Sequence, residues 1–197
     1  MHKGRLEAFS DGVLAIIITI MVLELKVPHT EDISGLVPLI PVFISYLISF
    51  VFIGIYWNNH HHLLHSVQKV NGSILWANMH LLFWLSLIPF TTAWMGENHF
   101  PTWPVALYGV NLMFSGIAYF ILTRCLIAYH GPKSDLAIAI EGDFKGKISV
   151  VLYSIAIGMA FVNSWVSYAI YFAVAIMWLV PDRRIERVLE NHEKSKG

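Results

Sequence analysis

Residues 36–57, LVPLIPVFISYLISFVFIGIYW, form an apolar run that contains no charged side chain. A hydrocarbon core about 30 Å thick needs roughly 20 apolar helical residues, so this run is long enough to cross a bilayer as one helix. Turn-forming residues such as Asn71-Gly72 and Gly131-Pro132 separate it from later runs, and the longest loops are expected near 60–71 and 130–146. Four further stretches fit the same template, the third of them being the shortest: 73–94, 105–127, 148–161 and 165–180.

The composition excludes several classes of protein. Of the 197 residues, 56% are hydrophobic and 13% are charged, whereas an ordinary soluble domain has about 25% charged residues. The formal net charge is zero, which gives no excess of basic residues for a nucleic-acid partner. The single cysteine, Cys125, lacks the paired spacing of zinc and redox motifs. We therefore expect an all-α integral membrane protein that is not an enzyme and that binds no cofactor or metal.

A sixth span is expected near the N-terminus, where the uncharged stretch is short. Gly12 to Leu23 covers about 18 Å at 1.5 Å per residue, and it lies between Asp11 and Glu24. Ser10 and Asp11 must then lie at membrane depth on the cytoplasmic side, where a carboxylate facing lipid would cost several kcal/mol. Because these side chains must face protein or water, the sequence predicts an interior helix shielded by the other five.

The basic residues predict the orientation in the membrane. With six spans and a cytoplasmic N-terminus, all but one of the 13 Lys and Arg residues fall on the cytoplasmic side, the exception being Lys26. An odd number of spans would place the basic C-terminal residues outside, so the asymmetry also favours an even number. We expect a six-helix transmembrane domain over 1–181 and a basic tail over 182–197, with both termini on the cytoplasmic side of the plasma membrane.

One face of the first helix carries a continuous stripe. A projection at 100° per residue assigns to it Arg5, Phe9, Gly12, Ile16, Thr19, Ile20 and Leu23. Asp11 points about 140° away from Ile16, so we expect this carboxylate to hold the helix against its neighbours through hydrogen bonds. Ile18 and Val22 lie on the other side and are expected to pack. On periodicity alone, a stripe of Ile, Thr and Leu is more often a packing face than the lining of a pore.

The run RLEAFSDGVLAIIITIMVLE, residues 5–24, resembles one known signature. Its Arg-x-x-x-Phe-Ser-Asp pattern, followed at once by an apolar helix, is similar to that of bacterial members of the transmembrane protein 175 family. Vertebrate members of that family are endosomal and lysosomal potassium channels. The segment Tyr56-Trp57-Asn58-Asn59-His60-His61 also resembles the corresponding segment of that family, and six spans in about 200 residues agree with the resemblance.

The resemblance implies roles for particular residues. In that family the first helix lines the pore. Carried over by position, this role implies that Ile16, Thr19, Ile20 and Leu23 face the ion path. A polar network would brace this helix, and its expected members are Arg5, Phe9, Ser10, Asp11 and Trp57 with one of His60, His61 and His80. Vertebrate chains carry two six-helix repeats and assemble as dimers. Because this chain has one copy of the motif, the resemblance implies a homotetramer.

The expected function is a modestly selective potassium channel. The sequence has no Thr-Val-Gly-Tyr-Gly filter, so selectivity must come from side chains rather than from a cage of carbonyl groups. Rings of Ile16 and Leu23 would form hydrophobic constrictions that an ion crosses only by losing part of its water. Potassium loses water at a lower cost than sodium does, and Thr19 hydroxyls would replace some of the lost ligands.

Two other interpretations start from the histidines. His61 and His65, at i and i+4, share a helix face as metal ligands do, but histidine-box enzymes need several such clusters. The alternative function is a proton-conducting or proton-coupled membrane transport protein, because His60, His61, Asp11 and Glu24 could titrate near a water-filled path. A proton relay needs titratable groups spaced through the membrane, whereas residues 12–23 offer one hydroxyl.

A reporter fused to the C-terminus should be found in the cytoplasm. The expectation follows from the asymmetry of the basic residues, which sets orientation during insertion. Paired fusions to a phosphatase that is active only outside and to a fluorescent protein that folds inside would measure it. A tail outside the cell would contradict the six-helix topology.

Overall fold

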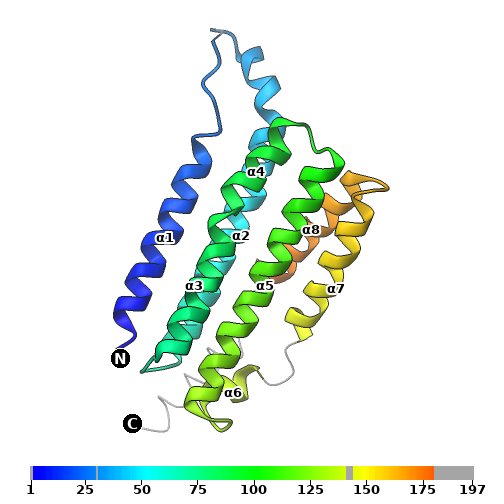
Figure 1. The fold of residues 1–197 in the computed structure, drawn as a ribbon. Coiled ribbons are helices and arrows are strands. Elements are labelled where there is room, and N and C mark those ends of the chain that lie inside the picture. The colour runs from blue at the N-terminus through cyan, green and yellow to red at the C-terminus, as the bar shows by residue number, and fades with distance from the viewer. Residues whose placement is uncertain (1, 30, 141–143, 180–197) are drawn as a thin grey trace.

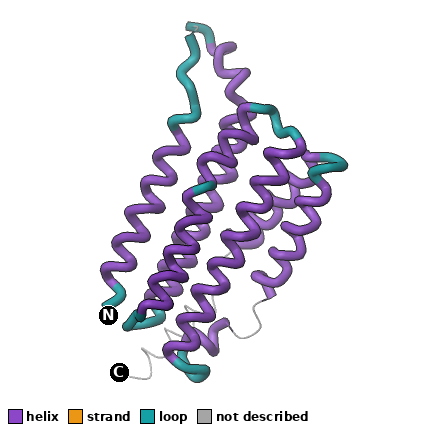
Figure 2. The backbone as a smooth tube through the Cα atoms, viewed as in Figure 1, coloured by secondary structure: helices purple, strands orange, loops and turns teal. Residues whose placement is uncertain are grey.

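The computed structural model describes residues 2–29, 31–140 and 144–179. In these ranges every regular element is helical and no strand forms (Figure 2), which confirms the all-α class. The basic tail predicted over 182–197 lies outside the described residues. The elements are α1 (Gly4–Val22), η1 (Ile33–Leu39), α2 (Ile40–His65), α3 (Gly72–Ser86), α4 (Ile88–Glu97), α5 (Thr102–His130), α6 (Asp135–Ile140), α7 (Phe144–Met159) and α8 (Ser164–Leu179).

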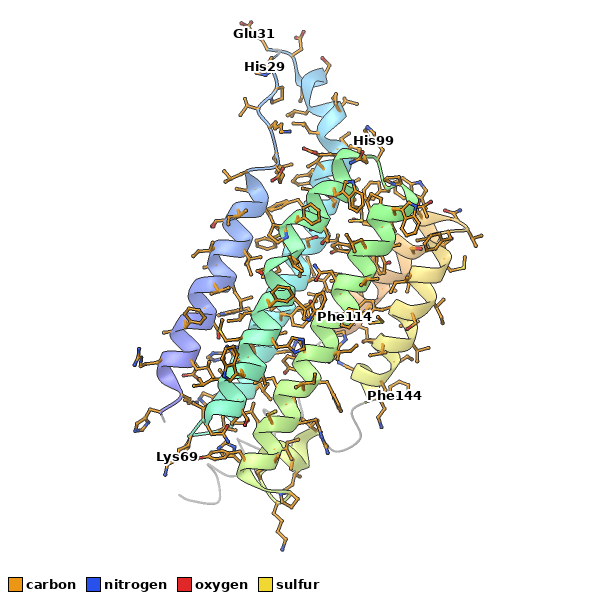
Figure 3. The ribbon with its side chains drawn as sticks, viewed as in Figure 1. His29, Glu31, Lys69, His99, Phe114 and Phe144 are labelled. Atoms are coloured by element: carbon orange, nitrogen blue, oxygen red, sulfur yellow. The ribbon has the colours of Figure 1, made fainter. Side chains whose placement is uncertain are left out.

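The long helices run side by side in a bundle (Figure 1). Helix α1 lies at one edge and packs on α2, α3 and α4, whereas α7 and α8 pack on α5 at the other side. Lys69 lies at the end of the bundle that holds the N-terminus, and His29, Glu31 and His99 lie at the opposite end (Figure 3). Helix α1 therefore has a covered side and an uncovered side within a single chain.

Three helical segments are long and apolar enough to cross a membrane: Ile33–His65, Gly72–Glu97 and Thr102–His130. They contain the predicted spans 36–57, 73–94 and 105–127. The other three predicted spans, 12–23, 148–161 and 165–180, overlap α1, α7 and α8, and residue 180 lies outside the described residues. Helix α1 includes charged residues, and α7 and α8 have 16 residues each. The count of six spans therefore stays a prediction.

The second of these segments is broken at Leu87, which separates α3 from α4. Pro89 lacks a backbone N–H, and its ring clashes with the carbonyl four residues earlier, so the ladder of α-helical hydrogen bonds is interrupted at this point. Asn111 of α5 repairs the break: with its amide oriented to satisfy its neighbours, it donates to Trp84 O (2.8 Å) and accepts from Ile88 N (3.2 Å). A side chain thus replaces hydrogen bonds that the backbone loses.

Helix α2 is longer than the sequence suggested. A loop was expected to begin near His60, but α2 continues to His65 and the connection to α3 is correspondingly shorter. The side chain of Asn71 accepts a hydrogen bond from Ile74 N (3.0 Å), which caps the start of α3. The histidines of the cluster therefore lie on the last turns of a helix.

Gly109 allows α5 and α8 to pack together. A Cβ added at this position would collide with the hydroxyl of Tyr171, a fully buried residue of α8. That hydroxyl is held in place because it donates to Val105 O (3.0 Å). The contact leaves no room for a side chain at position 109.

Replacing Gly109 by Ala should lower the Tm of the purified protein by a few degrees. Overpacking of this kind costs about 1–3 kcal/mol, against a gain of about 1 kcal/mol for replacing a helical glycine. Thermal unfolding in detergent measures the difference. Gly158→Ala on α7 is the control, because a Cβ there meets no atom within 4 Å in the described structure; equal effects of the two changes would contradict the packing argument.

Candidate pore-lining helix and its polar network

Helix α1 has two faces of different character. Its buried face follows helical spacing and packs against the neighbouring helices; it consists of Leu6, Ser10, Leu14, Ile17 and Met21. The four residues predicted to line the pore are all exposed in the single chain, with Ile16 at 58%, Ile20 at 44% and Leu23 at 74%, and Thr19 exposed as well. The predicted stripe therefore lies on the side of α1 that the other helices leave open within residues 2–29, 31–140 and 144–179.

The opposite face differs in detail from the sequence prediction. Ile18 is half-buried and packs against the core, as expected. Val22, which was also expected to pack, is 44% exposed. The reason is that the contact with the rest of the bundle is centred on Leu14, Ile17 and Met21, which places Val22 at its edge.

The Thr19 hydroxyl is engaged within its own helix. It donates to the backbone carbonyls of Ile16 (2.9 Å) and Ala15 (3.1 Å). A hydroxyl has one proton and two lone pairs, so this arrangement leaves the oxygen with electron pairs for an acceptor role. An exposed oxygen of this kind suits a cation better than an anion.

A buried chain of hydrogen bonds links three helices. Asn78 Nδ2 of α3 donates to Ser10 Oγ of α1 (2.9 Å), and Asn78 Oδ1 lies 2.7 Å from His60 Nε2 of α2. The exposed fractions of Ser10, Asn78 and His60 are 0%, 0% and 2%. Because an amide oxygen only accepts, His60 must carry a proton on Nε2. Of the three candidate histidines, His60 is the one that this structure connects to Ser10.

A second link joins α1 directly to α2. Trp57 Nε1 donates to Asp11 Oδ1 (3.0 Å), and the ring of His61 stacks on Trp57 with 6.1 Å between centroids. Asp11 and Trp57 are both partly open to the surroundings, so this link lies at the edge of the α1 contact. The structure thus brings together Asp11, Trp57 and His61 beside the Ser10–Asn78–His60 chain.

The other predicted members of the network lie elsewhere. His80 accepts a hydrogen bond from Trp84 Nε1 (3.0 Å) within α3, and Trp84 stacks on Phe114 of α5, which Figure 3 labels. Arg5 is exposed, and Phe9 is 51% exposed on the open side of α1. Among the described residues neither Arg5 nor Phe9 is joined to Trp57 or a histidine, so their bracing role stays a prediction.

Sequence reasoning missed Asn78. The available signal was its position inside an apolar span, where an unpaired amide is costly and a conspicuous polar residue needs a partner. Trp57, His60 and His61 could be predicted because they belong to the Tyr56–His61 segment. Asn78 instead connects that motif to α1.

Both ends of α1 are also tied to the bundle. At its beginning, Lys3 Nζ donates to Leu64 O near the end of α2 (2.8 Å), where a cation is favoured by the exposed carbonyls. After its end, Lys26 pairs with Glu97 at the end of α4 (3.0 Å). The hydrogen bond and negative charge of Glu97 raise the pKa of Lys26 above its usual range. The pair is exposed, so it positions more than it stabilises.

Residues 5–89 match the family model described as endosomal/lysosomal potassium channel TMEM175. Over 192 residues the chain is 55% identical to a potassium channel of Chryseobacterium sp. (strain P1-3), and the match covers 98% of this chain and 100% of the relative. The chain belongs to the TMEM175 family. As a TMEM175 member it is an ion-channel protein of membranes and not an enzyme.

Other TMEM175 proteins extend the comparison. The fold matches the crystal structure of a lysosomal potassium-selective channel TMEM175 homolog from Chamaesiphon minutus with a TM-score of 0.78, at 30% identity, covering 91% of this chain and 97% of that chain. The chain is also 29% identical to the mouse endosomal/lysosomal proton channel TMEM175, over 72% of this chain and 32% of that protein. The predicted family is confirmed. The relatives that this chain resembles include proteins named as potassium channels and proteins named as proton channels.

Replacing Asn78 by Leu should destabilise the protein strongly. The change leaves the Ser10 hydroxyl and His60 Nε2 buried without a partner, at about 1–3 kcal/mol for each group. Thermal unfolding in detergent measures the loss, and the exposed Asn98→Leu is the control. Adding Ser10→Ala should cost less in the Asn78→Leu background than in the wild type, because the two side chains are coupled. Additive losses would show that the bond contributes nothing.

Proposed function

We propose that the chain forms a homotetrameric, potassium-conducting channel in the plasma membrane, with α1 of each subunit lining the pore. The observation that carries the proposal is the exposure of Ile16, Thr19, Ile20 and Leu23 on the side of α1 that the other described helices leave uncovered. The potassium-channel names of the Chryseobacterium and Chamaesiphon relatives support the choice of ion. Six spans over residues 1–181 and cytoplasmic termini belong to the same proposal.

Ile16 and Leu23 would form two successive narrow points. They are separated by two helical turns, about 10.5 Å along the axis. Rings of apolar side chains exclude water from a narrow path, so an ion passes only when it gives up part of its hydration shell. Potassium holds that shell less tightly than sodium, which yields a preference of modest size.

Thr19 would lie between the two constrictions. Its hydroxyl proton is used by the Ala15 and Ile16 carbonyls, so its oxygen is available to a partly dehydrated cation. Ile20 lies on the other side of the same stripe and would complete the apolar wall. A single ring of hydroxyl oxygens between apolar rings offers few ligands, which fits weak rather than filter-grade discrimination.

The polar network would keep the stripe aimed at the pore. The hydrogen bonds that Ser10 accepts from Asn78 and Asp11 accepts from Trp57 would fix the rotation of α1 about its own axis, because each connects one specific position to a neighbouring helix. A rotation large enough to turn Ile16 away would break both. Arg5 and Phe9 continue the open face toward the N-terminal end, where another subunit would supply their partners.

Proton conduction is the second candidate, and the name of the mouse relative is the observation in its favour. Against it, the only hydroxyl of α1 between Gly12 and Leu23 donates to its own backbone. A continuous relay of titratable groups is therefore lacking along this stretch. Reversal potentials of the reconstituted wild type under separate potassium and pH gradients distinguish the two ions.

Replacing Ile16 or Leu23 by Asn should raise potassium flux several-fold and reduce the preference for potassium over sodium. A polar side chain lets water fill the constriction, so a hydrated sodium ion no longer has to lose its shell. Flux from liposomes loaded with each cation measures both quantities. Ile155→Asn is the matched control, because Ile155 is also half-exposed, at 50%, but lies on α7, on the far side of the bundle from α1 (Figure 1).

Unchanged selectivity in Ile16→Asn and Leu23→Asn, with normal tetramer assembly on a sizing column, would reject α1 as the pore lining. A change of similar size in Ile155→Asn would point to α7 instead. Monomeric protein that conducts potassium would reject the tetramer.

A further inference from the structure

A cavity of about 410 Å³ lies between α2, α5, α7 and α8, and among the described residues α1 contributes nothing to its wall. This volume falls in the range of roughly 300–1,000 Å³ that small-molecule sites occupy. The wall is mainly aromatic and aliphatic, with Phe52, Ile55, Tyr56, Phe120 and Tyr153 among its residues. The cavity therefore lies apart from the proposed ion path and is built for an apolar occupant.

The wall of the cavity is partly exposed where α5 and α7 contribute to it. Two of its lining residues, Phe120 and Val150, are 52% and 37% exposed, so the wall is incomplete on that side. Helix α5 is one of the helices long and apolar enough to cross a membrane. At this depth the surroundings of α5 are acyl chains, which can enter the cavity sideways without crossing water.

The lining also includes polar side chains. Asn59 and Ser149 donate to backbone carbonyls of their own helices, whereas Thr123 and Lys147 are the two polar residues that bear on a ligand. Thr123 is 4% exposed, lines the cavity, and its hydroxyl has no hydrogen-bond partner within the described structure. Lys147, on the first turn of α7, lies at the rim and is exposed. A buried hydroxyl in an apolar environment requires an acceptor, and a lysine at the membrane surface attracts anionic headgroups.

We infer that this cavity holds one acyl chain of an anionic phospholipid. The phosphate pairs with Lys147 at the rim, and an ester carbonyl of the glycerol linkage accepts from the Thr123 hydroxyl. The acyl chain then lies against Phe52, Ile55 and Tyr153. Helices α2 and α5 end, and α6 lies, at the end of the bundle that holds the N-terminus (Figure 1). The cavity is lined by residues of the C-terminal halves of α2 and α5 and by Ile140 of α6, so it lies in that half of the bundle.

Thermal unfolding of the purified full-length protein tests the site. Dioleoyl phosphatidylglycerol added to the detergent solution should raise the Tm of the wild type by several degrees, and more than dioleoyl phosphatidylcholine does. Gly116→Leu should abolish the rise, because a Cβ at position 116 meets only the Tyr56 hydroxyl at 3.8 Å, so the larger side chain enters the cavity itself. Gly158→Leu, where a Cβ meets no described atom within 4 Å, should retain it.

The two polar groups are tested separately. Lys147→Gln should remove the advantage of phosphatidylglycerol over phosphatidylcholine, whereas the exposed Lys133→Gln, outside the cavity wall, should keep it. Thr123→Val keeps the shape of the side chain but removes the donor, so it should reduce the response to both lipids alike. A Gly116→Leu protein that responds like the wild type would overturn the inference.

A structure of the wild type with phosphatidylglycerol brominated on its acyl chain decides the point without any substitution. Bromine density between α2, α5 and α7 supports the site. Bromine confined to the outer surface of the bundle, or density of the chain's own residues in the cavity, overturns it. Neither result depends on whether α1 lines the pore, so the inference and the proposed function can fail separately.

Discussion

The hydrogen-bonded chain of Ser10, Asn78 and His60 is the interaction on which the arrangement of α1 depends. Hydrocarbon offers no partner to a polar group, so each of these side chains must find one inside the bundle. Their geometry leaves little choice: the bonds measure 2.9 Å and 2.7 Å and join α1, α3 and α2 at a single level. Once that face of α1 is fixed against its neighbours, its opposite face is necessarily the one that remains uncovered.

The same principle recurs deeper in the bundle, away from α1. Ser49 of α2 lies 2.7 Å from Thr92 of α4 and 2.9 Å from Tyr108 of α5, measured between hydroxyl oxygens. Apolar side chains pack in many alternative registers, whereas a hydroxyl contact is lost when one helix slides by a turn. These two small polar clusters therefore specify the alignment of helices whose surfaces are otherwise almost uniformly apolar.

Much of this architecture could be predicted from the sequence. The apolar runs at 36–57, 73–94 and 105–127 all lie in helices long enough to span, because length and hydropathy are local properties. The Arg5 to Asp11 motif identified the family correctly, because a motif is also a local property of the sequence. The break at Leu87 was missed although Pro89 was visible, since the run on both sides of it is apolar. Periodicity also placed Ile16, Thr19, Ile20 and Leu23 on one face, and the structure leaves that face exposed.

The partners of each polar side chain could not be predicted in this way. His60 and His80 look equivalent in the sequence, but only the tertiary arrangement turns the first toward Asn78 and the second toward Trp84. Asn78 itself belongs to no recognisable sequence motif that would indicate its role. A helical projection gives the direction of a side chain relative to its own axis, whereas the identity of the facing helix depends on the whole bundle.

The interruption at Leu87 has a mechanical consequence. An unbroken helix resists bending because every turn is hydrogen-bonded to the next, but here the amide of Asn111 supplements the backbone bonds that remain around Leu87, from Leu87 N to Trp84 O (3.2 Å) and from Thr91 N to Leu87 O (3.1 Å). Bending at this joint therefore meets fewer backbone bonds than in a continuous helix, and it strains the contacts of Asn111. Asn78 lies on the α3 half and donates to Ser10, so a change in the tilt of α3 would act on α1 through that hydrogen bond.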